Sequence, residues 1–351
     1  MKSTPLRALG FGASFVFVAT HQAFAEDTDS QDLALGLAGA SESGLSWEGE
    51  IELGNETILR SDNAAREGGA YYGIGSVDAA YSFGNGIAIF GGATVEELEN
   101  GSGDTGYGAY VHELGVEIDL GSTALQVGKV SPRFGTAFNE TAGYFGGSLA
   151  EDYELTEQVG VLAAIDMGAA GTLSLGAFYA DNTFLSESVG FNRGRNSTTD
   201  GGAGNTGKLN NFSIQWQKEF GDTRVWAGAR HLSAGAGDVS DETGGFVTVA
   251  HSFGSTFDLF AEVAAFEGFG GTADDATYAT LNGVYYVGDW SLSGTIARRE
   301  VTSTGITDLV SVGAEYELSN GATLGGALAF VDEAGTKDTV LGLNIVIPLG
   351  G

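Results

Sequence analysis

Very short turns, each centred on glycine, alternate with longer polar loops from Ser43 to the end of the chain. Gly, Asn and Asp tolerate the positive φ that tight hairpin turns require, so each turn can close a β-hairpin. Short turns at one end and long loops at the other are typical of antiparallel barrels that cross a membrane. The seven turns are Phe83-Gly84-Asn85-Gly86, Leu120-Gly121-Ser122, Met167-Gly168-Ala169-Ala170-Gly171, Phe220-Gly221-Asp222, Phe253-Gly254-Ser255, Val287-Gly288-Asp289 and Leu318-Ser319-Asn320-Gly321.

Apolar and polar residues alternate with a period of two between these turns, which predicts strands with two different faces. In the stretch that ends at Leu120, the residues predicted to share the apolar face are Tyr110, His112, Leu114, Val116, Ile118 and Leu120. The opposite face carries Glu113, Gly115, Glu117 and Asp119. This pattern fits lipid outside and water inside, although a soluble antiparallel sheet shows the same period with its apolar face turned inward.

Bulky residues before the turns favour the membrane interpretation. Tyr81 and Phe83 precede one turn, and Tyr285 and Val287 precede another. Such residues would form a belt at a membrane interface, where amphipathic rings are favoured. In a soluble protein, so much apolar surface beside every turn would be hard to bury.

The pattern predicts an all-β fold, a 16-stranded antiparallel transmembrane β-barrel. Fourteen or eighteen strands remain alternatives, because the faces of 86–97 and 123–130 are weak. Two insertions, 131–156 and 183–207, interrupt the hairpin rhythm, and the second is interpreted as a mobile surface loop. The expected strands are 44–54, 70–83, 86–97, 107–120, 123–130, 157–168, 171–182, 208–219, 223–234, 244–253, 256–268, 275–287, 290–301, 306–318, 322–332 and 337–349.

The first 25 residues have the features of a secretory signal peptide. Lys2 and Arg7 supply positive charge, an apolar stretch follows, and Ala23-Phe24-Ala25 is a small-x-small cleavage site. The apolar stretch is shorter than the about 20 residues that a membrane-spanning helix needs. We therefore expect a cleaved signal peptide over 1–25 and a barrel domain over 26–351, in which 26–41 has no assigned role.

Composition excludes several classes of protein. The chain has 46 acidic and 15 basic residues, and the signal contains two of the basic ones, so the mature charge is 13 − 46 = −33. This acidity argues against a nucleic-acid partner, because phosphates require Lys and Arg. The chain has no Cys, which excludes disulfides and thiolate metal sites. Only 3 of the 351 residues are Pro: one lies in the signal, Pro132 opens a long loop, and Pro348 sits at the extreme end of the chain, so proline is kept away from the middle of the expected strands.

The signal peptide, sixteen short strands, apolar-Gly turns and a long insertion after the fifth strand together resemble Gram-negative outer-membrane general porins, particularly the acidic type of alphaproteobacteria such as Rhodobacter. The resemblance implies that the insertion folds into the barrel as a constriction loop and that three copies form a homotrimer. Such porins usually end in an aromatic residue, whereas this chain ends Ile347-Pro348-Leu349-Gly350-Gly351. That difference indicates an atypical assembly signal or a more distant barrel family.

The resemblance places the pore constriction at 131–156. Carboxylates on this loop would face basic side chains on the wall, and rings of carboxylates favour cations. The loop could instead be external, with its acids in solvent. The candidate acids are Glu140, Glu151, Asp152 and Glu154, and the candidate bases are Lys129 and Arg133 at the loop's base with Arg230 and Arg299 on the wall.

The alternation also assigns many carboxylates to the polar face of the strands, and a water-filled lumen would keep them solvated. We expect a preference for cations. Aromatic residues on the same face either form a binding track for a solute or merely fill space; they are Trp226, Phe260, Phe266, Tyr278 and Tyr286. The carboxylates are Glu48, Glu50, Glu52, Glu113, Glu117, Asp258, Glu262, Glu315 and Glu317.

No enzymatic motif stands out: Gly-x-Ser-x-Gly, His-Glu-x-x-His and P-loop patterns do not occur. His112 and His251 are predicted on the apolar face, and His231 at a strand end. A membrane hydrolase with a Ser/His pair remains an alternative, since such pairs are recognised by geometry. No cofactor is expected. Calcium at loop acids such as Asp152 and Glu154 is implied only by the resemblance, and no EF-hand spacing supports it.

The expected function is therefore a channel in the outer membrane of a Gram-negative bacterium, not an enzyme. It would pass ions and small hydrophilic solutes by passive diffusion, in contact with outer-membrane lipid. One alternative is a substrate-selective channel for a sugar, phosphate or metal chelate. Another is a structural or adhesive barrel that does not conduct.

Overall fold

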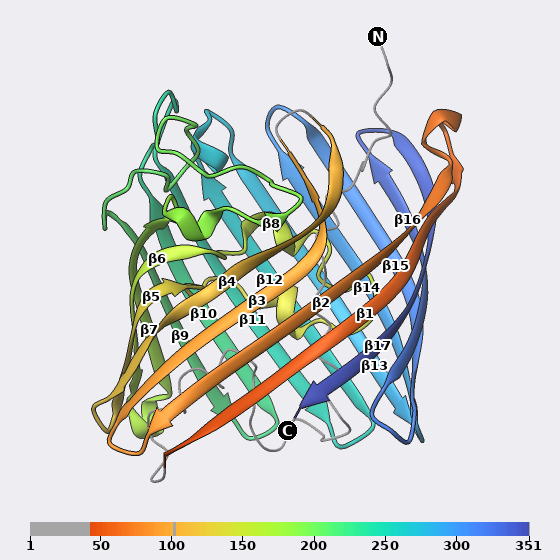
Figure 1. Cartoon of the computed structure of the whole chain (residues 1–351). Coiled ribbons are helices and arrows are strands. Elements are labelled where there is room, and N and C mark those ends of the chain that lie inside the picture. The colour runs from red at the N-terminus through yellow and green to blue at the C-terminus, as the bar shows by residue number, and fades with distance from the viewer. Residues whose placement is uncertain (1–42, 101–102, 351) are drawn as a thin grey trace.

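The chain folds into a closed antiparallel barrel in this computed structural model, which describes residues 43–100 and 103–350. Hydrogen bonds join the last strand to the first, and the two pair from Glu48–Gly350 to Ser61–Asp338 (Figure 1). Closure leaves no open sheet edge around the ring, as lipid requires of a spanning sheet. The predicted signal peptide 1–25 and the unassigned segment 26–41 lie outside the described residues.

Sixteen long strands make the ring and one two-residue strand is added to it. The short helices are η1 (Ala64–Arg66), α2 (Ala137–Glu140), η2 (Ala150–Tyr153), η3 (Gly168–Ala170), η4 (Phe184–Ser186) and η5 (Phe269–Gly271). None of the helices in the described ranges is long and apolar enough to cross a membrane. The strands are β1 (Ser43–Ser61), β2 (Gly68–Phe83), β3 (Ile87–Glu99), β4 (Thr105–Asp119), β5 (Thr123–Val130), β6 (Gln158–Asp166), β7 (Thr172–Ala180), β8 (Val189–Gly190), β9 (Asn211–Phe220), β10 (Thr223–Leu232), β11 (Glu242–Phe253), β12 (Phe257–Glu267), β13 (Ala276–Val287), β14 (Trp290–Val301), β15 (Gly305–Glu317), β16 (Thr323–Glu333) and β17 (Thr336–Gly350).

The predicted sixteen-stranded barrel is confirmed, including the strands 86–97 and 123–130 whose faces are weak. Each of the seven predicted turns contains at least one glycine with positive φ, for example Gly221 at 62° and Gly288 at 59°. The largest boundary difference is in β1, which continues to Ser61 rather than ending at 54. The part of β1 beyond its predicted end at residue 54 continues to pair with β17, as far as Ser61 with Asp338.

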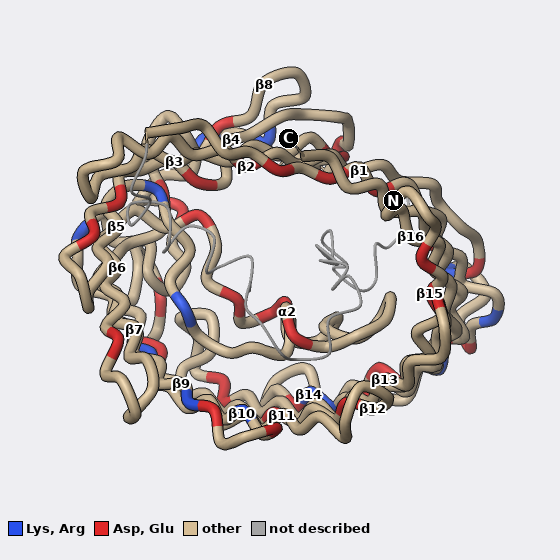
Figure 2. The backbone as a smooth tube through the Cα atoms, turned by 90° about the horizontal axis from the view of Figure 1, so that it is seen from below, with Lys and Arg blue, Asp and Glu red and all other residues tan. Residues whose placement is uncertain are grey.

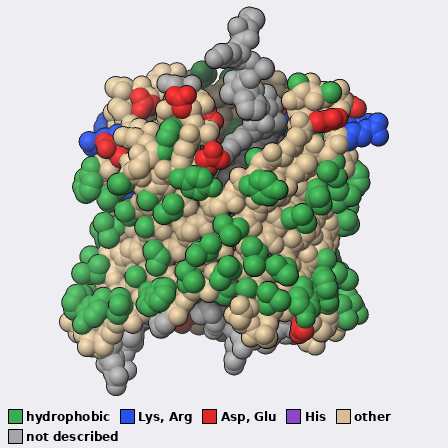
Figure 3. All heavy atoms as spheres, turned by 45° about the vertical axis from the view of Figure 1, so that its right-hand side comes forward, with side chains coloured by type: hydrophobic (Ala, Val, Ile, Leu, Met, Phe, Trp, Pro, Cys, Tyr) green, Lys and Arg blue, Asp and Glu red, His purple; other side chains and the backbone are tan. Residues whose placement is uncertain are grey.

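The outer wall is apolar and carries a belt of rings beside the short turns. Phe83, Phe253, Tyr285 and Trp290 are each about half exposed there. Figure 3 shows hydrophobic side chains over the middle and lower wall, with most acidic side chains at the upper rim. The faces therefore point as predicted, with apolar residues outward on most strands.

One part of the predicted face assignment is wrong. A β-bulge between Gly92 and Ala93 shifts the pairing of β3 with β4, and His112 is the extra residue. Such a bulge exchanges the two faces of a strand. Leu114 therefore points outward, whereas His112 faces inward and bonds Asp78 across 2.8 Å. Tyr110, on the same face as His112, also turns inward.

The segment 183–207, which was interpreted from the sequence as a mobile surface loop, contributes a strand to the wall. Its β8 pairs with the upper part of β4, Gly108 with Gly190 and Ala109 with Val189. The physical reason is that β5 pairs with β4 only as far as Leu114 and leaves the edge of β4 above it without a neighbour.

The insertion after β5 folds into the barrel, as predicted. Figure 2 shows it, with α2, inside the ring of strands and along the side formed by β10 to β14. The main cluster of buried apolar residues lies between this insertion and the wall, and includes Phe134, Phe145, Phe246 and Phe266. The barrel thus has a packed core on one side of its lumen.

Candidate functional site

The inward insertion, called L3 here, comprises residues 131–157 between β5 and β6. It contains the two short helices α2 and η2 and is anchored to several strands of the wall. These anchors determine where L3 lies across the lumen, so they are described first.

Glu262, an inward residue of β12, is the most connected anchor. Its side chain is 2% exposed and accepts hydrogen bonds from the backbone N–H and hydroxyl of Thr136 at 2.8 and 2.9 Å. The Ala137 N–H at 3.3 Å and the hydroxyls of Tyr153 and Thr248, each at 2.5 Å, complete the set. A buried carboxylate is tolerated when donors surround it in this way. Glu262 thus binds the first turn of α2 and the last residue of η2.

Arg230 of β10 forms the second anchor. Its guanidinium bonds Glu242 of β11, with Nη2 2.6 Å from the carboxylate, and Nη1 donates to the backbone oxygen of Tyr153. The same group lies 4.6 Å from the ring centres of Phe134 and Phe266, a distance at which a cation is attracted to an aromatic face. Arg230 is 5% exposed. It therefore supports L3 from behind rather than facing open water.

Two ion pairs connect acids of L3 to bases of the wall. Asp152 accepts from Arg299 Nη1 at 2.8 Å and from the Tyr278 hydroxyl at 3.0 Å. Glu140 accepts from Arg224 Nη2 at 2.8 Å. Each pair neutralises one negative charge on L3 and one positive charge on the wall behind it.

The middle of L3 is held by neutral contacts. Asn282 of β13 exchanges two hydrogen bonds with the backbone of Ala142, at 3.0 and 2.9 Å. Next along the chain, the Tyr144 ring lies over Gly342 of β17, where a Cβ would come within 2.3 Å of the ring. A glycine at this inward position therefore leaves the space that the ring fills. L3 therefore reaches from β5, where it begins, to β17.

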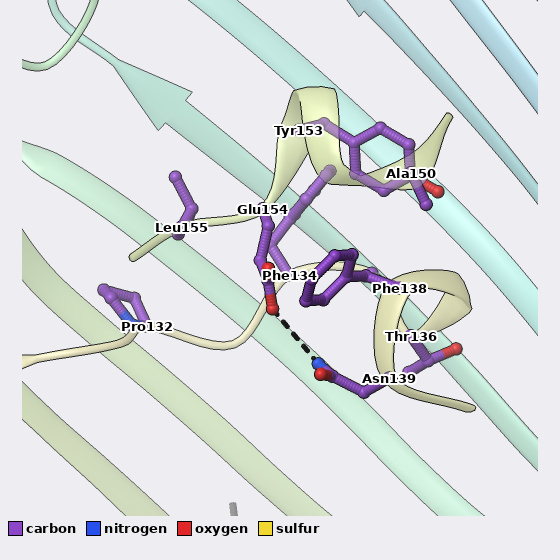
Figure 4. Close-up of a pocket in the computed structure, with 10 residues that line it drawn as sticks. Pro132, Phe134, Thr136, Phe138, Asn139, Ala150, Tyr153, Glu154 and Leu155 are labelled. Atoms are coloured by element: carbon purple, nitrogen blue, oxygen red, sulfur yellow. Dashed lines mark hydrogen bonds between the residues drawn. The ribbon is translucent and has the colours of Figure 1, made fainter. Parts of the chain in front are cut away.

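A small pocket separates the two arms of L3, and Glu154 points into it (Figure 4). One carboxylate oxygen of Glu154 accepts from Asn139 Nδ2 at 3.1 Å. Burial raises the pKa of Glu154 to about 7, although the Asn139 hydrogen bond acts in the opposite direction. Glu154 is thus a loop acid that changes charge near neutral pH.

The wall on the other side of the lumen is acidic. Residues 43–119, which form β1 to β4 with their loops, contain fourteen Asp and Glu but only two basic residues, Arg60 and Arg66. Arg66 is itself paired with Glu333 and Asp338 at 3.2 and 2.9 Å. The bases that face inward around L3, in contrast, lie on β10 and β14. The expected pairs of loop acids with wall bases therefore form where L3 packs against the wall. The wall formed by β1 to β4, across the lumen, carries a net negative charge instead.

The structure brings together only some of the residues predicted at the constriction. Asp152 and Arg299 are in contact, while Arg230 is paired with Glu242. Lys129 shares its face with exposed Val127 and is fully buried in an ion network with Glu157 and Asp181. Arg133 is buried at the start of L3, and Glu151 is half-buried on η2. Which of these residues narrows the pore stays a prediction.

Several residues of this site were not predicted as such. Glu262 was assigned to the polar face but expected to be solvated, and Arg224 was not singled out. Both occupy inward positions by strand parity, which is the signal that could have found Arg224. Nothing local indicates which inward residues L3 will cover, because that depends on the path of a distant loop, whose contacts lie 84 positions from Arg224 and 109 or more from Glu262.

Calcium at Asp152 and Glu154 does not fit this arrangement. The Asp152 carboxylate is occupied by a guanidinium and a phenol, and Glu154 is directed into a narrow pocket. No group of three or more His, Asp and Glu that could hold a metal ion occurs within residues 43–100 and 103–350.

Four of the inward aromatic residues lie under L3. Trp226, Phe260, Phe266 and Tyr278 are each no more than 4% exposed. They fill the space between the loop and the wall. Tyr286, lower in the barrel, is half-buried.

No family model and no curated protein matches the sequence. Solved structures do match in fold. The outer membrane channel DcaP of Acinetobacter baumannii superposes with a TM-score of 0.64 at 9% identity, covering 88% of this chain and 98% of that one. A mutant of the Rh. blastica porin superposes with a TM-score of 0.56 at 13% identity, covering 87% of this chain and 100% of that one. The anion-selective porin from Comamonas acidovorans superposes with a TM-score of 0.57 at 13% identity, covering 88% of this chain and 100% of that one.

Proposed function

We propose that this chain, whose fold is that of the outer-membrane porins, forms a water-filled channel for passive diffusion of ions and small hydrophilic solutes in the outer membrane of a Gram-negative bacterium. The observation that carries the proposal is L3, which is anchored inside a closed barrel and narrows its lumen on one side. Solutes would be filtered by size at L3 and by charge along the acidic wall. This role requires no catalysis and no cofactor.

We further propose a preference for cations. The inward bases Arg224, Arg230 and Arg299 each pair with a carboxylate, so little of their positive charge is left for solutes. The wall formed by β1 to β4 keeps an excess of carboxylates. One porin of the same fold is named anion-selective, so the charges that line the lumen, not the fold, would decide which ions pass.

Reversal potentials of the purified protein in planar bilayers, measured across a salt gradient, test this preference. The wild-type potential should have the sign of cation selectivity. The double variant Glu48→Gln/Glu50→Gln, which removes two inward charges from β1, should move the potential toward zero. Anion selectivity of the wild type would contradict the proposal.

A substrate-selective channel and a non-conducting barrel are the rival functions. Burial of four inward aromatic residues under L3 removes most of the predicted binding track, which favours general diffusion. Conductance that saturates with a sugar, phosphate or metal chelate would support the selective channel. Absence of single-channel conductance would support a structural or adhesive barrel.

We also propose that three copies associate. The strands β5, β6 and β7 have only 8, 9 and 9 residues, whereas β1 has 19. Contact with a neighbouring copy would cover the exposed apolar residues on the outside of these short strands, such as Val127, Val161 and Leu175. The mass of the native complex in detergent, compared with that of the heat-denatured chain, tests the homotrimer.

A further inference from the structure

The barrel wall has a gap above β5. The pairing of β5 with β4 ends at Lys129–Leu114, yet β4 continues upward to Thr105. At about 3.3 Å per residue and a tilt of about 45°, the eight residues of β5 rise roughly 19 Å. The apolar band of such barrels is about 25 Å tall. The gap therefore begins within the membrane, at the place where L3 leaves the wall.

The chain between β7 and β9 fills this gap (Figure 1). Its β8 pairs with β4, and the Phe191 N–H continues the pairing by donating to the Tyr107 oxygen at 3.0 Å. The Phe191 ring lies against Gly106, where a Cβ would come within 2.6 Å of it. We call residues 184–193 the strap.

Glu157, the last residue of L3, holds the strap in place. Its carboxylate accepts two hydrogen bonds from Arg193, at 2.9 and 2.5 Å, and lies 2.6 Å from Lys129 Nζ. Lys129 Nζ also donates to the Leu185 oxygen at 3.0 Å and lies 2.9 Å from Asp181. Bidentate Arg–carboxylate pairs are among the stronger polar contacts, and this network is largely buried. The two cations that meet at Glu157 come from β5 and from the strap.

The backbone of Glu157 is also unusual. Its φ of 53° lies in the left-handed region that favours glycine, and only one other non-glycine among the described residues, Ala334, shares this feature. Strain of this kind persists where the surroundings determine the conformation. Here the side chain of Glu157 is fixed by both cations, and its backbone oxygen accepts from the Asp181 N–H at 3.0 Å.

We propose that the strap is a section of the barrel wall that closes the gap above β5, and that the ion pairs of Glu157 hold the strap in this position. The strap separates the lumen from the outer side of the wall at the level where β5 is too short to do so. Because Glu157 also ends L3, the same residue joins the constriction loop to this part of the wall.

A cross-strand disulfide tests the position of the strap. The chain has no cysteine, so Ala109→Cys/Val189→Cys introduces a single pair at directly opposed positions. With Glu157 intact, mild oxidation should form the disulfide in full. Adding Glu157→Gln should slow its formation about tenfold, because the charged acceptor of Arg193 and Lys129 is lost. Adding Glu187→Gln, which removes an exposed carboxylate of the same strap, should leave the rate unchanged.

Planar-bilayer recordings test whether the strap closes the barrel wall to ions. Glu157→Gln should increase the current noise of the open channel, the oxidised disulfide should suppress that increase, and a reductant should restore it. If Glu157→Gln does not assemble, Arg193→Gln, which keeps the Lys129–Glu157 pair, should give the same changes at smaller size. Failure of the disulfide to form, or equal rates in Glu157→Gln and Glu187→Gln, would overturn the proposal. These rates do not require conductance, so they stay interpretable if the wild type proves not to be a channel.

Discussion

The Tyr153 hydroxyl lies 2.5 Å from the Glu262 carboxylate and joins L3 to β12 across 109 positions of the sequence. The backbone oxygen of the same tyrosine accepts from Arg230. Tyr153 is therefore fixed at both ends, by a wall acid and a wall base. Its position sets that of η2, and with it the positions of Asp152 and Glu154.

Glu262→Gln should loosen L3. The amide keeps one acceptor oxygen but presents an NH₂ group to donors that now lack a partner, at a cost of about 1–3 kcal/mol for each buried donor left unpaired. Single-channel conductance and the size limit for neutral sugars should both rise. Glu267→Gln, an exposed residue of the same strand, is the matched control. Unchanged conductance in Glu262→Gln would show that the other anchors suffice.

Cation preference should decrease as pH falls from 8 to 6. The pKa of Glu154 is raised to about 7, so its negative charge is present above that pH and is lost below it. Reversal potentials measured over this range should move toward zero at the lower pH. In Glu154→Gln the part of the change due to this residue should be absent. If the reversal potential of Glu154→Gln changes with pH as much as that of the wild type, Glu154 is not the titrating group.

Arg299→Gln should increase cation preference. The substitution removes a positive charge from the inner wall and leaves Asp152 with only the Tyr278 hydroxyl as donor. Arg298→Gln is the control, because Arg298 is exposed and pairs with Asp308 away from L3. Reversal potentials should separate the two adjacent substitutions. Equal effects would mean that Asp152 and Arg299 do not influence the permeating ions.

Gly288→Ala should destabilise the barrel by about 1–2 kcal/mol, because an L-residue is strained at a left-handed φ of 59°. Apart from its two chain neighbours, no residue has an atom within 4 Å of the added Cβ, so any loss comes from the backbone conformation. Gly294→Ala, where φ is not positive and the nearest atom is 3.8 Å away, should cost less. The temperature at which the heat-modifiable barrel unfolds on a gel measures both variants.

Most of the barrel was predictable because its determinants are local. The period of two sets the faces, and positive-φ glycines such as Gly221 and Gly288 set the hairpins. The prediction failed at His112, because a bulge depends on how β3 and β4 pair and not on the alternation within either strand. It failed again at β8, because nothing in residues 183–207 shows that the edge of β4 lacks a neighbour.

The charged residues of the site also divide into features that the local sequence predicts and features that depend on tertiary contacts. Parity alone identified Arg230, Arg299 and Glu262 as inward residues. It did not show that Arg230 and Glu262 would be buried under L3, nor that Lys129 would face outward into the network with Glu157. Those outcomes depend on the path of L3 and of the strap.

The sequence by itself determined the turn positions and the outward face of most strands, and it favoured sixteen strands over fourteen or eighteen, since these features follow from residues a few positions apart. Only the tertiary structure decided which inward charges remain open to the lumen. L3 and the strap are placed by contacts between residues that are 36 positions apart for Arg193–Glu157 and 147 for Arg299–Asp152, and contacts of this kind leave no periodic trace in the sequence.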